Sequence, residues 1–452
     1  MIVKVNERAA SIVEKLNEVG FEAYVVGGCV RDSIMGKKPK DWDITTNAKT
    51  EQIMQVFEGF EIIPTGIQHG TVTIMVGGEG FEVTTYRIDG DYSDGRHPDS
   101  VIFTSNLKED LARRDFTINA MAYNPNEGII DFFGGQEDLK NKVIRCVGKA
   151  DDRFSEDALR VMRALRFASV LGFKIEGNTS NAIFEKSKNL DKISKERINV
   201  ELVKMLNGNG VLHILLTYRE VLGEIIPDLI PMFDFVQNNK FHAYDVWGHT
   251  ARVVRCCNNS NNMLRVAALF HDIGKPDTYT EADNVGHFYG HAKVSVLKSE
   301  KIMKDLKFST AEIDLVLSLI EHHDVIFTPT KKFVLRMLNK LGEEKFRLLM
   351  SLREADIKGQ GVNLPNDNRL EQLYKTHELL NNLELKSECF SLKQLAVNGN
   401  DLIALGFKPG KEFGEILNYL LQKVIDCEVI NDKRALLTLL NKKYRIDIER
   451  VM

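Results

Sequence analysis

The sequence contains no apolar run that approaches the roughly 18 to 20 residues a membrane-spanning helix needs. Its six cysteines are scattered and form no CxxC pair, which predicts reduced thiols and a cytoplasmic protein. The N-terminal residues have the pattern of an amphipathic helix and lack the continuous apolar stretch of a signal peptide. We therefore expect no membrane association.

Length and charge limit the class of protein further. With 452 residues the chain exceeds what one hydrophobic core supports, so about two to four domains are expected. Its 43% hydrophobic and 27% charged residues are typical of a globular protein. The formal net charge of −4 argues against a general, sequence-independent binder of polyanions, although a local basic groove can still hold nucleic acid.

The spacing of apolar residues changes along the chain. Up to about residue 145, runs rich in β-branched and aromatic residues alternate with turn signals, which predicts strands at AYVVGG, DWDIT, GTVTIMV, FEVTTYR and IIDFFGG. Helices are predicted between them at TEQIMQVFEG and KEDLARRDFTINAMAY. From Glu156 onward apolar residues recur with the helical period of 3.6 residues. The sequence therefore predicts an α+β protein, a mixed α/β head followed by an all-helical remainder.

Two carboxylates stand close together in DWDIT. On a strand, Asp41 and Asp43 point to the same face, and the strand FEVTTYR offers Glu82, whose neighbours Phe81 and Val83 would face the core. Three carboxylates from two adjacent strands suit Mg²⁺, and two such ions can activate a hydroxyl and steady a leaving pyrophosphate. A solvated turn is the alternative for DWD alone. Gly27 and the helix expected after it add a backbone that can approach phosphate, which favours the metal site.

These motifs carry a family resemblance. GGCVRD followed by DWD is similar to the nucleotidyltransferase superfamily, which includes poly(A) polymerases and tRNA CCA-adding enzymes. GTVTIMV, FEVTTYR, DGRHPDSVIF, RRDFTINAMAY and EDALRVMRALRFA, in family order, narrow the resemblance to the bacterial-type (class II) CCA-adding enzymes. A fainter similarity continues in LAVNGNDLIALGFKPGKEFGEIL. The resemblance implies that Asp41 and Asp43 hold two catalytic Mg²⁺ ions, with Glu82 as the third carboxylate.

The resemblance also implies the nucleotide contacts. The contacts are Gly27, Gly28 and Arg31, followed by the three residues of the RRD motif at 113–115. Arg113 and Arg114 are suited to triphosphate oxygens, and Asp115 can accept from a ribose hydroxyl. The alternative is an ordinary charged cluster on a helix face. The family context favours the functional interpretation.

The segment EDALRVMR suggests how a base is selected. If the segment is one helix, Asp157 and Arg160 stand at i and i+3 and Arg163 one turn further, while Glu156 is expected to start the helix. A carboxylate accepts from an exocyclic amine and a guanidinium donates to the adjacent acceptor. Cytosine and adenine offer that pattern, whereas uracil and guanine turn a carbonyl toward the carboxylate. The resemblance implies that this pair selects C and A without a template; a surface ion pair is the alternative.

The polar segment DYSDGRHPDS, residues 91–100, resembles the loop that CCA-adding enzymes use to switch from C to A. CC-only relatives lack it, although a plain surface loop looks much the same. We therefore predict a tRNA nucleotidyltransferase that adds CCA from CTP and ATP. The alternatives are a poly(A) polymerase, an A-adding or CC-adding relative, or a metal phosphohydrolase.

The second half of the chain is rich in histidine. The pattern H…HD…D of HD-domain metal phosphohydrolases is matched by His249, His271, Asp272 and Asp356. Candidates for a second metal are His291, His322 and His323. These residue types can bind either a divalent transition metal or Mg²⁺, so they do not identify the metal. An adjacent His-Asp pair is costly to bury without a partner or a metal. The resemblance implies a subsidiary hydrolase of 2′,3′-cyclic or other phosphoesters, or a metal-stabilised body.

Four domains are predicted in all: the head (1–145), a helical neck with the nucleotide-recognition helix (146–225), an HD-type domain (226–365) and a helical tail that binds tRNA (366–452). The helical part is expected to hold tRNA. KKFVLRMLNK and NKKYRIDIER are candidates for phosphate contacts, with solvated helix faces as the alternative. No protein partner is predicted.

Overall fold

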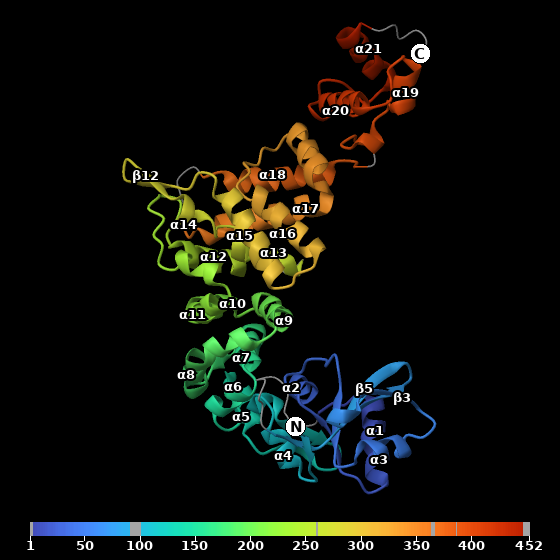
Figure 1. Cartoon of the computed structure of the whole chain (residues 1–452), viewed down its shortest axis with the longest axis vertical. Coiled ribbons are helices and arrows are strands. Elements are labelled where there is room, and N and C mark those ends of the chain that lie inside the picture. Colours follow the sequence, from blue (N-terminus) through green and yellow to red (C-terminus); the bar gives the residue numbers. More distant parts are fainter. Residues whose placement is uncertain (1–2, 91–100, 259–260, 363–366, 386, 446–452) are drawn as a thin grey trace. The chain divides into compact units, whose positions relative to one another are not determined.

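Figure 1 shows the computed structural model of the chain, which describes residues 3–90, 101–258, 261–362, 367–385 and 387–445. The chain divides into two compact units. The first is Met1–Ile230 with Asp305–Lys307, and the second is Pro231–Lys304 with Phe308–Met452. Within the described ranges no helix is both long and apolar enough to cross a membrane. The predicted switching loop, residues 91–100, lies outside the described residues.

A seven-stranded mixed sheet forms the head. Its strands, in spatial order, are β3 (Glu61–Gly66), β4 (Thr71–Val76), β5 (Glu79–Thr85), β2 (Asp43–Thr46), β1 (Ala23–Val26), β8 (Met121–Asn124) and β9 (Gly128–Asp131). Every neighbouring pair is antiparallel except β2 and β5, which run parallel. A separate antiparallel pair consists of β6 (Arg87–Asp89) and β7 (Val101–Phe103). All five predicted strands lie in the large sheet, so the mixed α/β head is confirmed.

Helices of the head form where the sequence offers a cap and an apolar stripe. α1 (Glu7–Glu18) starts behind Asn6, whose side chain accepts from two backbone amides of the first turn. The helix buries Ile12 and Leu16 and packs against β1 and α3 (Thr50–Val56). In Figure 1 both helices lie beside the sheet.

The predicted helix KEDLARRDFTINAMAY is wrong in its second half. Helix α4 covers Leu107–Ala112, a 3-10 turn follows at Thr117–Asn119, and the remaining residues form β8. Strand β8 is buried along its length and pairs with both β1 and β9. Pairing on both edges of a buried strand therefore outweighs the local helical pattern.

Helices make up most of the rest of the first unit. In chain order they are α2 (Gly28–Ile34) in the head, then α5 (Gly135–Asn141), α6 (Ala150–Glu156), α7 (Leu159–Leu171), α8 (Gly177–Lys186), α9 (Lys195–Leu206), α10 (Val211–Thr217) and α11 (Arg219–Ile225). Helix α7 is the most central, because it packs against α6, α9 and α10 and buries most of its side chains. Beside it the short strands β10 (Val143–Ile144) and β11 (Lys174–Ile175) run parallel.

The segment EDALRVMRALRFA is not the single helix that the sequence predicts. Helix α6 ends at Glu156, Asp157 is extended with φ −135° and ψ 103°, and α7 begins at Leu159. The cause is the Asp157 side chain, whose Oδ1 accepts from the backbone amide of Leu159 at 3.0 Å and so caps the next helix. Glu156 thus ends a helix and does not start one, and Asp157 shares no helix face with Arg160.

Within its described residues the second unit is helical apart from one hairpin, β12 (Thr280–Ala282) and β13 (Val285–His287). Its helices are α12 (Val246–Cys256), α13 (Asn262–Phe270), α14 (Lys275–Thr278), α15 (His291–Asp305), α16 (Thr310–His322), α17 (Lys331–Gly359), α18 (Arg369–Asn382), α19 (Gly399–Ala404), α20 (Lys411–Ile425) and α21 (Lys433–Tyr444). Helices α12, α13, α16 and α17 pack together, and α17 is interrupted at Gly342, where φ is 74°. Short 3-10 turns lie at Ile67–His69, Ser187–Lys192, Pro227–Met232 and Leu392–Gln394. The predicted helical remainder is confirmed, whereas the division into four domains stays a prediction.

Candidate functional sites

The three head carboxylates lie on one face of the sheet. Asp43 begins β2 and is in register with Glu82 of its parallel neighbour β5. Asp41 is two residues earlier and shares the side of Asp43, and all three are exposed, whereas Trp42 between them is buried. The two adjacent strands expected from the sequence are therefore present.

Burial, with repulsion between carboxylates as a further cause, raises the pKa of Asp43 and of Glu82. The protein around Asp43 displaces water and raises its pKa; Arg114 opposes the rise and Asp41 adds to it. Loss of hydration also raises the pKa of Glu82, helped by the charges of Asp43 and Asp41. A divalent cation relieves such repulsion, and carboxylate oxygens are the ligands that Mg²⁺ prefers. The donor set therefore fits magnesium.

A glycine turn lies close to this face. Gly27, the residue before α2, has φ 82°, a left-handed value that favours glycine. A β-carbon at Gly27 would lie 2.8 Å from Nη1 of Arg114, so a larger residue would displace this arginine. Within α2, Nη1 of Arg31 donates to Oδ1 of Asn119 at 2.6 Å. The turn thus has two arginines close by.

Arg113 and Arg114 share one buried aspartate, Asp110, which the sequence analysis missed. Arg113 donates from Nε and Nη2 to Oδ1 of Asp110 at 3.0 and 2.8 Å, and Nη2 of Arg114 lies 3.6 Å from Oδ2. Burial would raise the pKa of Asp110, but the two guanidiniums outweigh it and lower the pKa. Asp110 also accepts from the hydroxyl of Thr45 in β2 at 3.2 Å. The arginines are thus tied to the strand that begins with Asp43; their i+3 and i+4 spacing from Asp110 was the available signal.

Asp115 is buried and bonded to protein groups through both oxygens. Oδ1 accepts from the backbone amide of Phe116 at 2.8 Å and from Nδ2 of Asn119 at 3.0 Å. Oδ2 accepts from Nε and Nη2 of Arg163 at 2.8 and 2.5 Å. Burial would raise the pKa of Asp115, yet Arg163 and Asn119 outweigh it and lower the pKa to about 2. The structure joins Asp115 to α7, whereas a contact to ribose stays a prediction.

Asp157 and Arg160 are each held by a different partner. Nη2 of Arg197 in α9 donates to Oδ2 of Asp157 at 3.1 Å. Nη1 of Arg160 donates to Oε2 of Glu156 at 2.6 Å, and its Nη2 donates to the backbone carbonyl of Arg113 at 3.0 Å. Both side chains are therefore oriented by the protein, and neither depends on the other.

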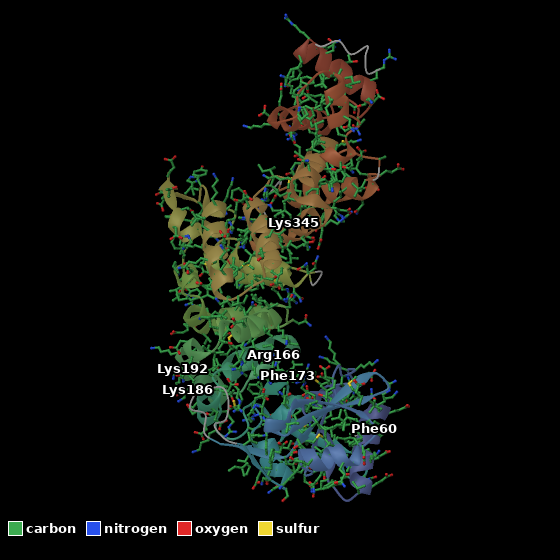
Figure 2. All side chains as sticks on the ribbon, turned by 45° about the vertical axis from the view of Figure 1, so that its right-hand side comes forward. Phe60, Arg166, Phe173, Lys186, Lys192 and Lys345 are labelled. Atoms are coloured by element: carbon green, nitrogen blue, oxygen red, sulfur yellow. The ribbon has the colours of Figure 1, made fainter. Side chains whose placement is uncertain are left out.

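Three arginines surround the ring of Phe167. The guanidinium carbons of Arg31, Arg163 and Arg166 lie 5.2, 5.4 and 3.9 Å from the ring centre. Arg166, labelled in Figure 2, also places Nε 2.6 Å from Oε2 of Glu201. The sequence analysis missed Arg166, although its position three residues after Arg163 on α7 was a usable signal.

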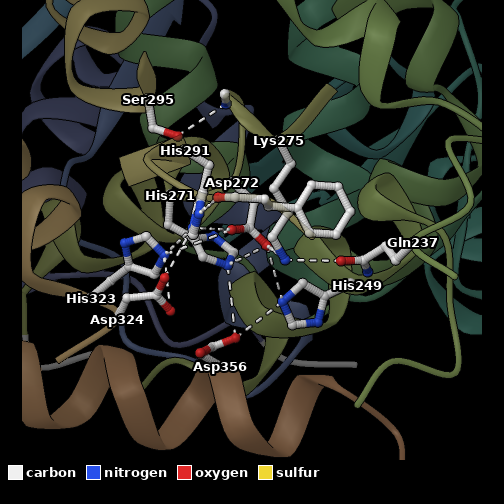
Figure 3. A network of polar contacts seen from close by, with 12 residues as sticks. Gln237, His249, His271, Asp272, Lys275, His291, Ser295, His323, Asp324 and Asp356 are labelled. Carbon is white, nitrogen blue, oxygen red and sulfur yellow. Dashed lines mark hydrogen bonds and ion pairs between the residues drawn. The ribbon is translucent and has the colours of Figure 1, made fainter. Parts of the chain in front are cut away.

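Six buried histidines and aspartates meet in the second unit (Figure 3). They are His249 of α12, His271 and Asp272 after α13, His291 of α15, His323 after α16 and Asp356 of α17. Their ligating atoms form two groups, His249–His271–Asp356 and Asp272–His291–His323, and within each group the atoms lie within 4.8 Å of one another. In the described part of the chain these are the two groups so closely spaced, and the head carboxylates are not among them.

Backbone carbonyls orient three of these imidazoles. Nδ1 of His271, His291 and His323 lies 2.8, 2.8 and 2.7 Å from the carbonyl oxygen three residues earlier in the chain. A carbonyl only accepts, so in the neutral imidazole the proton is on Nδ1 and Nε2 presents a lone pair to the cluster. Metal-ligating histidines in proteins are held in this way.

The charges in the cluster are those of a ligand set. Burial would raise the pKa of Asp272, but His271 and Lys275 outweigh it and hold the pKa well below its usual value. Burial is likewise outweighed at Asp356, whose pKa is held well below its usual value by hydrogen bonding to His249. Burial lowers the pKa of His249 itself and favours the neutral ring. Anionic carboxylates beside the neutral imidazole of His249 suit a divalent transition metal.

Two neighbours of His323 differ in their relation to the cluster. His322 belongs to neither of the two groups, and its Nδ1 lies 2.9 Å from the carbonyl oxygen of Ser318. Asp324, which the sequence analysis missed, places Oδ2 3.3 Å from Nε2 of His291. The signal was its position directly after the histidine pair in EHHD.

Three family models match the chain. They are the poly A polymerase head domain over residues 23–145, the probable RNA and SrmB-binding site of polymerase A over 172–229, and a putative tRNA nucleotidyltransferase domain 2 over 281–440. A CCA-adding enzyme of Ligilactobacillus salivarius is 36% identical over 441 residues, which cover 95% of each chain. The chain belongs to the CCA-adding enzyme family.

Other CCA-adding enzymes match along nearly their whole length. That of Enterococcus faecalis is 36% identical over 442 residues, covering 97% of this chain and 96% of its own. The crystal structure of the Bacillus stearothermophilus CCA-adding enzyme in complex with CTP has 29% identity and a TM-score of 0.72, covering 97% of both chains. The Thermotoga maritima CCA-adding enzyme complexed with tRNA has 21% identity and a TM-score of 0.61, covering 97% of this chain and 95% of its own, and shows the shared fold.

Membership in the CCA-adding enzyme family makes the chain a nucleotidyltransferase that depends on a divalent metal. In the head, the carboxylates of Asp43 on β2, Glu82 on β5 and Asp41 just before β2 are the donors that fit such an ion. The histidine cluster is a separate donor set in the second unit.

Proposed function

We propose that this chain adds C, C and A to the 3′ end of tRNA, using CTP and ATP and no nucleic-acid template. The observation that carries the proposal is the placement of Asp41, Asp43 and Glu82 on one face of two neighbouring strands. The near full-length match to CCA-adding enzymes supports this activity over poly(A) synthesis or the addition of A alone.

In the proposed reaction, Asp41 and Asp43 hold two Mg²⁺ ions, with Glu82 as the third carboxylate. Two such ions supply the activation of a hydroxyl and the neutralisation of a leaving pyrophosphate. The terminal 3′-hydroxyl of tRNA loses its proton to solvent and attacks the α-phosphate of CTP or ATP, the bond from that phosphate to its β-bridging oxygen breaks, and pyrophosphate leaves. The role of Asp41, Asp43 and Glu82 is to hold the ions that would orient the attacking and leaving oxygens.

The triphosphate is proposed to lie at the glycine turn. Gly27 and Gly28 carry no side chain that would block the backbone, and Arg114 lies against Gly27. Arg31 and Arg113 complete the cationic surroundings, and hydrogen bonds within the protein already fix both guanidiniums. A guanidinium held in this way loses little conformational freedom when it binds a phosphate.

Asp157 and Arg160 are proposed to read the base. The carboxylate accepts from an exocyclic amino group and the guanidinium donates to the adjacent acceptor, which admits C and A and rejects U and G. Arg197 holds Asp157 and Glu156 holds Arg160, so both are oriented before a nucleotide arrives. Arg163 lies one turn further along α7 and is the third proposed nucleotide contact of this segment.

The test uses tRNA transcripts that end before CCA, after C or after CC. Purified protein and Mg²⁺ receive CTP, ATP, both, or UTP with GTP, and the products are sized on a sequencing gel. We expect two additions of C and one of A, after which addition stops. UTP and GTP are expected to give no product, because their edges turn a carbonyl toward Asp157.

An unstructured RNA in the same assay separates the alternatives. Long A tails on that RNA would assign the chain to the poly(A) polymerases. Addition of A alone, and only to tRNA ending in CC, would assign it to the A-adding enzymes. No addition to any substrate would overturn the nucleotidyltransferase proposal.

We propose that tRNA lies along the helical part of the first unit, where residues 172–229 match an RNA-binding model. Lys186, Lys188 and Lys192 lie at the 3-10 turn Ser187–Lys192, and Figure 2 labels the first and last of them. Contacts from lysines to phosphates position RNA without reading its sequence. A cytoplasmic location is proposed as well, because tRNA is the substrate and the six cysteines are free.

A second, subsidiary function is proposed for the histidine cluster, the metal-dependent hydrolysis of phosphoesters. The observation in its favour is a contact between two buried acceptors. Nε2 of His271 lies 3.2 Å from Oδ2 of Asp272, an oxygen that also lies 2.7 Å from Nζ of Lys275. His249 and Asp356 complete the group around this contact, with Nε2 of His249 3.1 Å from Oδ1 of Asp356. A bound cation would satisfy all four side chains.

His271→Ala is expected to lower metal-dependent hydrolysis of bis(p-nitrophenyl) phosphate and of 2′,3′-cyclic nucleotides about 10²-fold or more. The reason is that the variant removes an imidazole ligand of the proposed metal ion. Release of nitrophenol and chromatography of the nucleotides measure the loss, with His322→Ala as the control outside the cluster. Hydrolysis equal to that of the parent protein would leave the cluster with a structural role alone.

A further inference from the structure

We propose that Arg153 is a positioning residue for nucleotide selection. It holds the base-reading segment in a fixed place relative to the arginines of the proposed triphosphate site. The inference rests on the proposed nucleotide addition and deepens it, because it assigns a part in selection to a residue outside the proposed nucleotide contacts. Arg153 lies in α6, three residues before Glu156, at which that helix ends.

The C-terminal end of α4 is held by two guanidiniums of the base-reading segment. Nη1 of Arg153 donates to the backbone carbonyl of Ala112 at 3.1 Å, and Nη2 of Arg160 donates to that of Arg113 at 3.0 Å. The last carbonyls of a helix lack partners within it and attract cations. Because the second carbonyl belongs to Arg113, the base-reading Arg160 is bonded directly to the main chain of a proposed triphosphate contact.

Glu156 joins these two guanidiniums to each other. Its Oε1 lies 2.5 Å from Nη2 of Arg153, and its Oε2 accepts from Nη1 of Arg160 at 2.6 Å. Nη1 of Arg160 also donates to the backbone carbonyl of Arg153 at 3.2 Å. The three side chains are only 10% to 23% exposed, so solvent screens their ion pairs less than those on an open surface. The network crosses the break between α6 and α7 at Asp157 and stiffens it.

Arg153 is the member of this network that reaches both α4 and Glu156. One planar guanidinium makes the two contacts, through Nη1 on one side and Nη2 on the other. Without it, Arg160 keeps its bonds to Glu156 and to the Arg113 carbonyl. The triphosphate arginines likewise keep Asp110. Loss of Arg153 therefore leaves each site intact and loosens the position of one relative to the other.

That relative position matters because a nucleotide is held at both ends at once. The triphosphate site determines where the edge of the base lies, and the bonds to Asp157 and Arg160 form only at donor–acceptor distances of about 2.7 to 3.2 Å. A displacement of about 1 Å can lower a rate on the order of 10²-fold. Cytosine and adenine lose their bonds when the two sites drift apart, whereas uracil forms no such bonds to lose.

The test compares Arg153→Met with the parent protein, since methionine preserves much of the side-chain length and removes the guanidinium. Full-length proteins receive tRNA that ends before CCA, and kcat/KM for CTP and the inhibition constant of UTP are measured. We expect kcat/KM for CTP to fall about tenfold or more. The inhibition constant of UTP, which binds through its triphosphate and ribose, is expected to stay within about twofold. The affinity for tRNA, measured by filter binding, is expected to be unchanged.

Asp152→Asn is the matched control, because Asp152 is the exposed neighbour of Arg153 in the same helix. Its kcat/KM for CTP is expected to stay within about twofold of the parent value. Arg153→Lys is the second variant should Arg153→Met fail to fold, and the same loss is expected, because a single ammonium does not reproduce the two arms of a guanidinium.

An unchanged kcat/KM for CTP in the Arg153 variants would overturn the inference. Equal losses in kcat/KM for CTP and in the binding of UTP would overturn it as well, because they indicate general damage to the first unit and no effect on selection. Failure of the proposed function gives a different result, since the parent protein itself would then add no C to tRNA.

Discussion

Asp43→Ala is expected to lower the rate of CTP and ATP incorporation into tRNA about 10³-fold or more, with tRNA affinity unchanged. Asp43 is in register with Glu82 and two residues from Asp41, so it is the central carboxylate of the three. Its loss removes one of the carboxylates that would hold the proposed ions. Single-turnover incorporation of radiolabelled CTP measures the rate, and filter binding measures the affinity for tRNA.

Glu79→Gln is the matched control for this experiment. Glu79 lies on the same strand as Glu82, and its exposed ion pair with Arg8 at 2.9 Å contributes little to stability. Incorporation by Glu79→Gln is expected to stay within about two-fold of the parent rate. A rate for Asp43→Ala within tenfold of the parent would contradict a catalytic role for this carboxylate.

Asp115→Ala is expected to destabilise the first unit by about 3 to 5 kcal/mol. The substitution leaves the half-buried guanidinium of Arg163 and the buried amide of Asn119 without their acceptor. Scanning calorimetry measures the effect, and the transition of the first unit is expected to move to lower temperature. The transition of the second unit, in which Asp115 has no part, is the internal control. A loss below about 1 kcal/mol would show that the ion pair contributes little.

The charge of Asp115 also makes the stability of the folded chain depend on pH, and stability is lost as the pH falls. Its pKa is lowered from the usual 3.8 to about 2, so the charged form stabilises the folded chain. That stability is fully present above about pH 4 and is lost as the pH falls toward 2, and its size is about 2 kcal/mol. Asp115→Asn does not titrate. Chemical denaturation measures the free energy of unfolding of both proteins. The excess of the parent over Asp115→Asn is expected to shrink between about pH 4 and 2. An excess that stays constant would contradict the lowered pKa of Asp115.

The carboxylate face was predictable because local rules determine it. The alternation of Trp42 and Ile44 with Asp41 and Asp43 fixes which side of the strand is buried. Glu82 follows from the same alternation in its own strand. That the two strands are neighbours did not follow from periodicity, because β3 and β4 intervene in the chain; the sequence analysis assumed it because three carboxylates together suit Mg²⁺.

What could not be predicted is the choice of partner among charged residues. Asp157 is bonded by Arg197, 40 residues further along the chain, and Arg163 by Asp115, 48 residues earlier. Such pairs are set by the packing of α7 against α9 and the head, and spacing along one helix carries no information about them. The break at Asp157 has the same origin, because an aspartate can cap a following helix as readily as sit inside one.

The parallel pairing of β2 and β5 has a consequence for folding. The sheet consists of two antiparallel ribbons, β3-β4-β5 and β2-β1-β8-β9, joined by one parallel seam. The carboxylates sit on both sides of that seam, Asp43 on one ribbon and Glu82 on the other. A divalent ion held between Asp43 and Glu82 would link the two ribbons and favour the assembled sheet by mass action. The proposed catalytic cation would therefore also stabilise the parallel pairing, which a two-residue hairpin turn cannot connect.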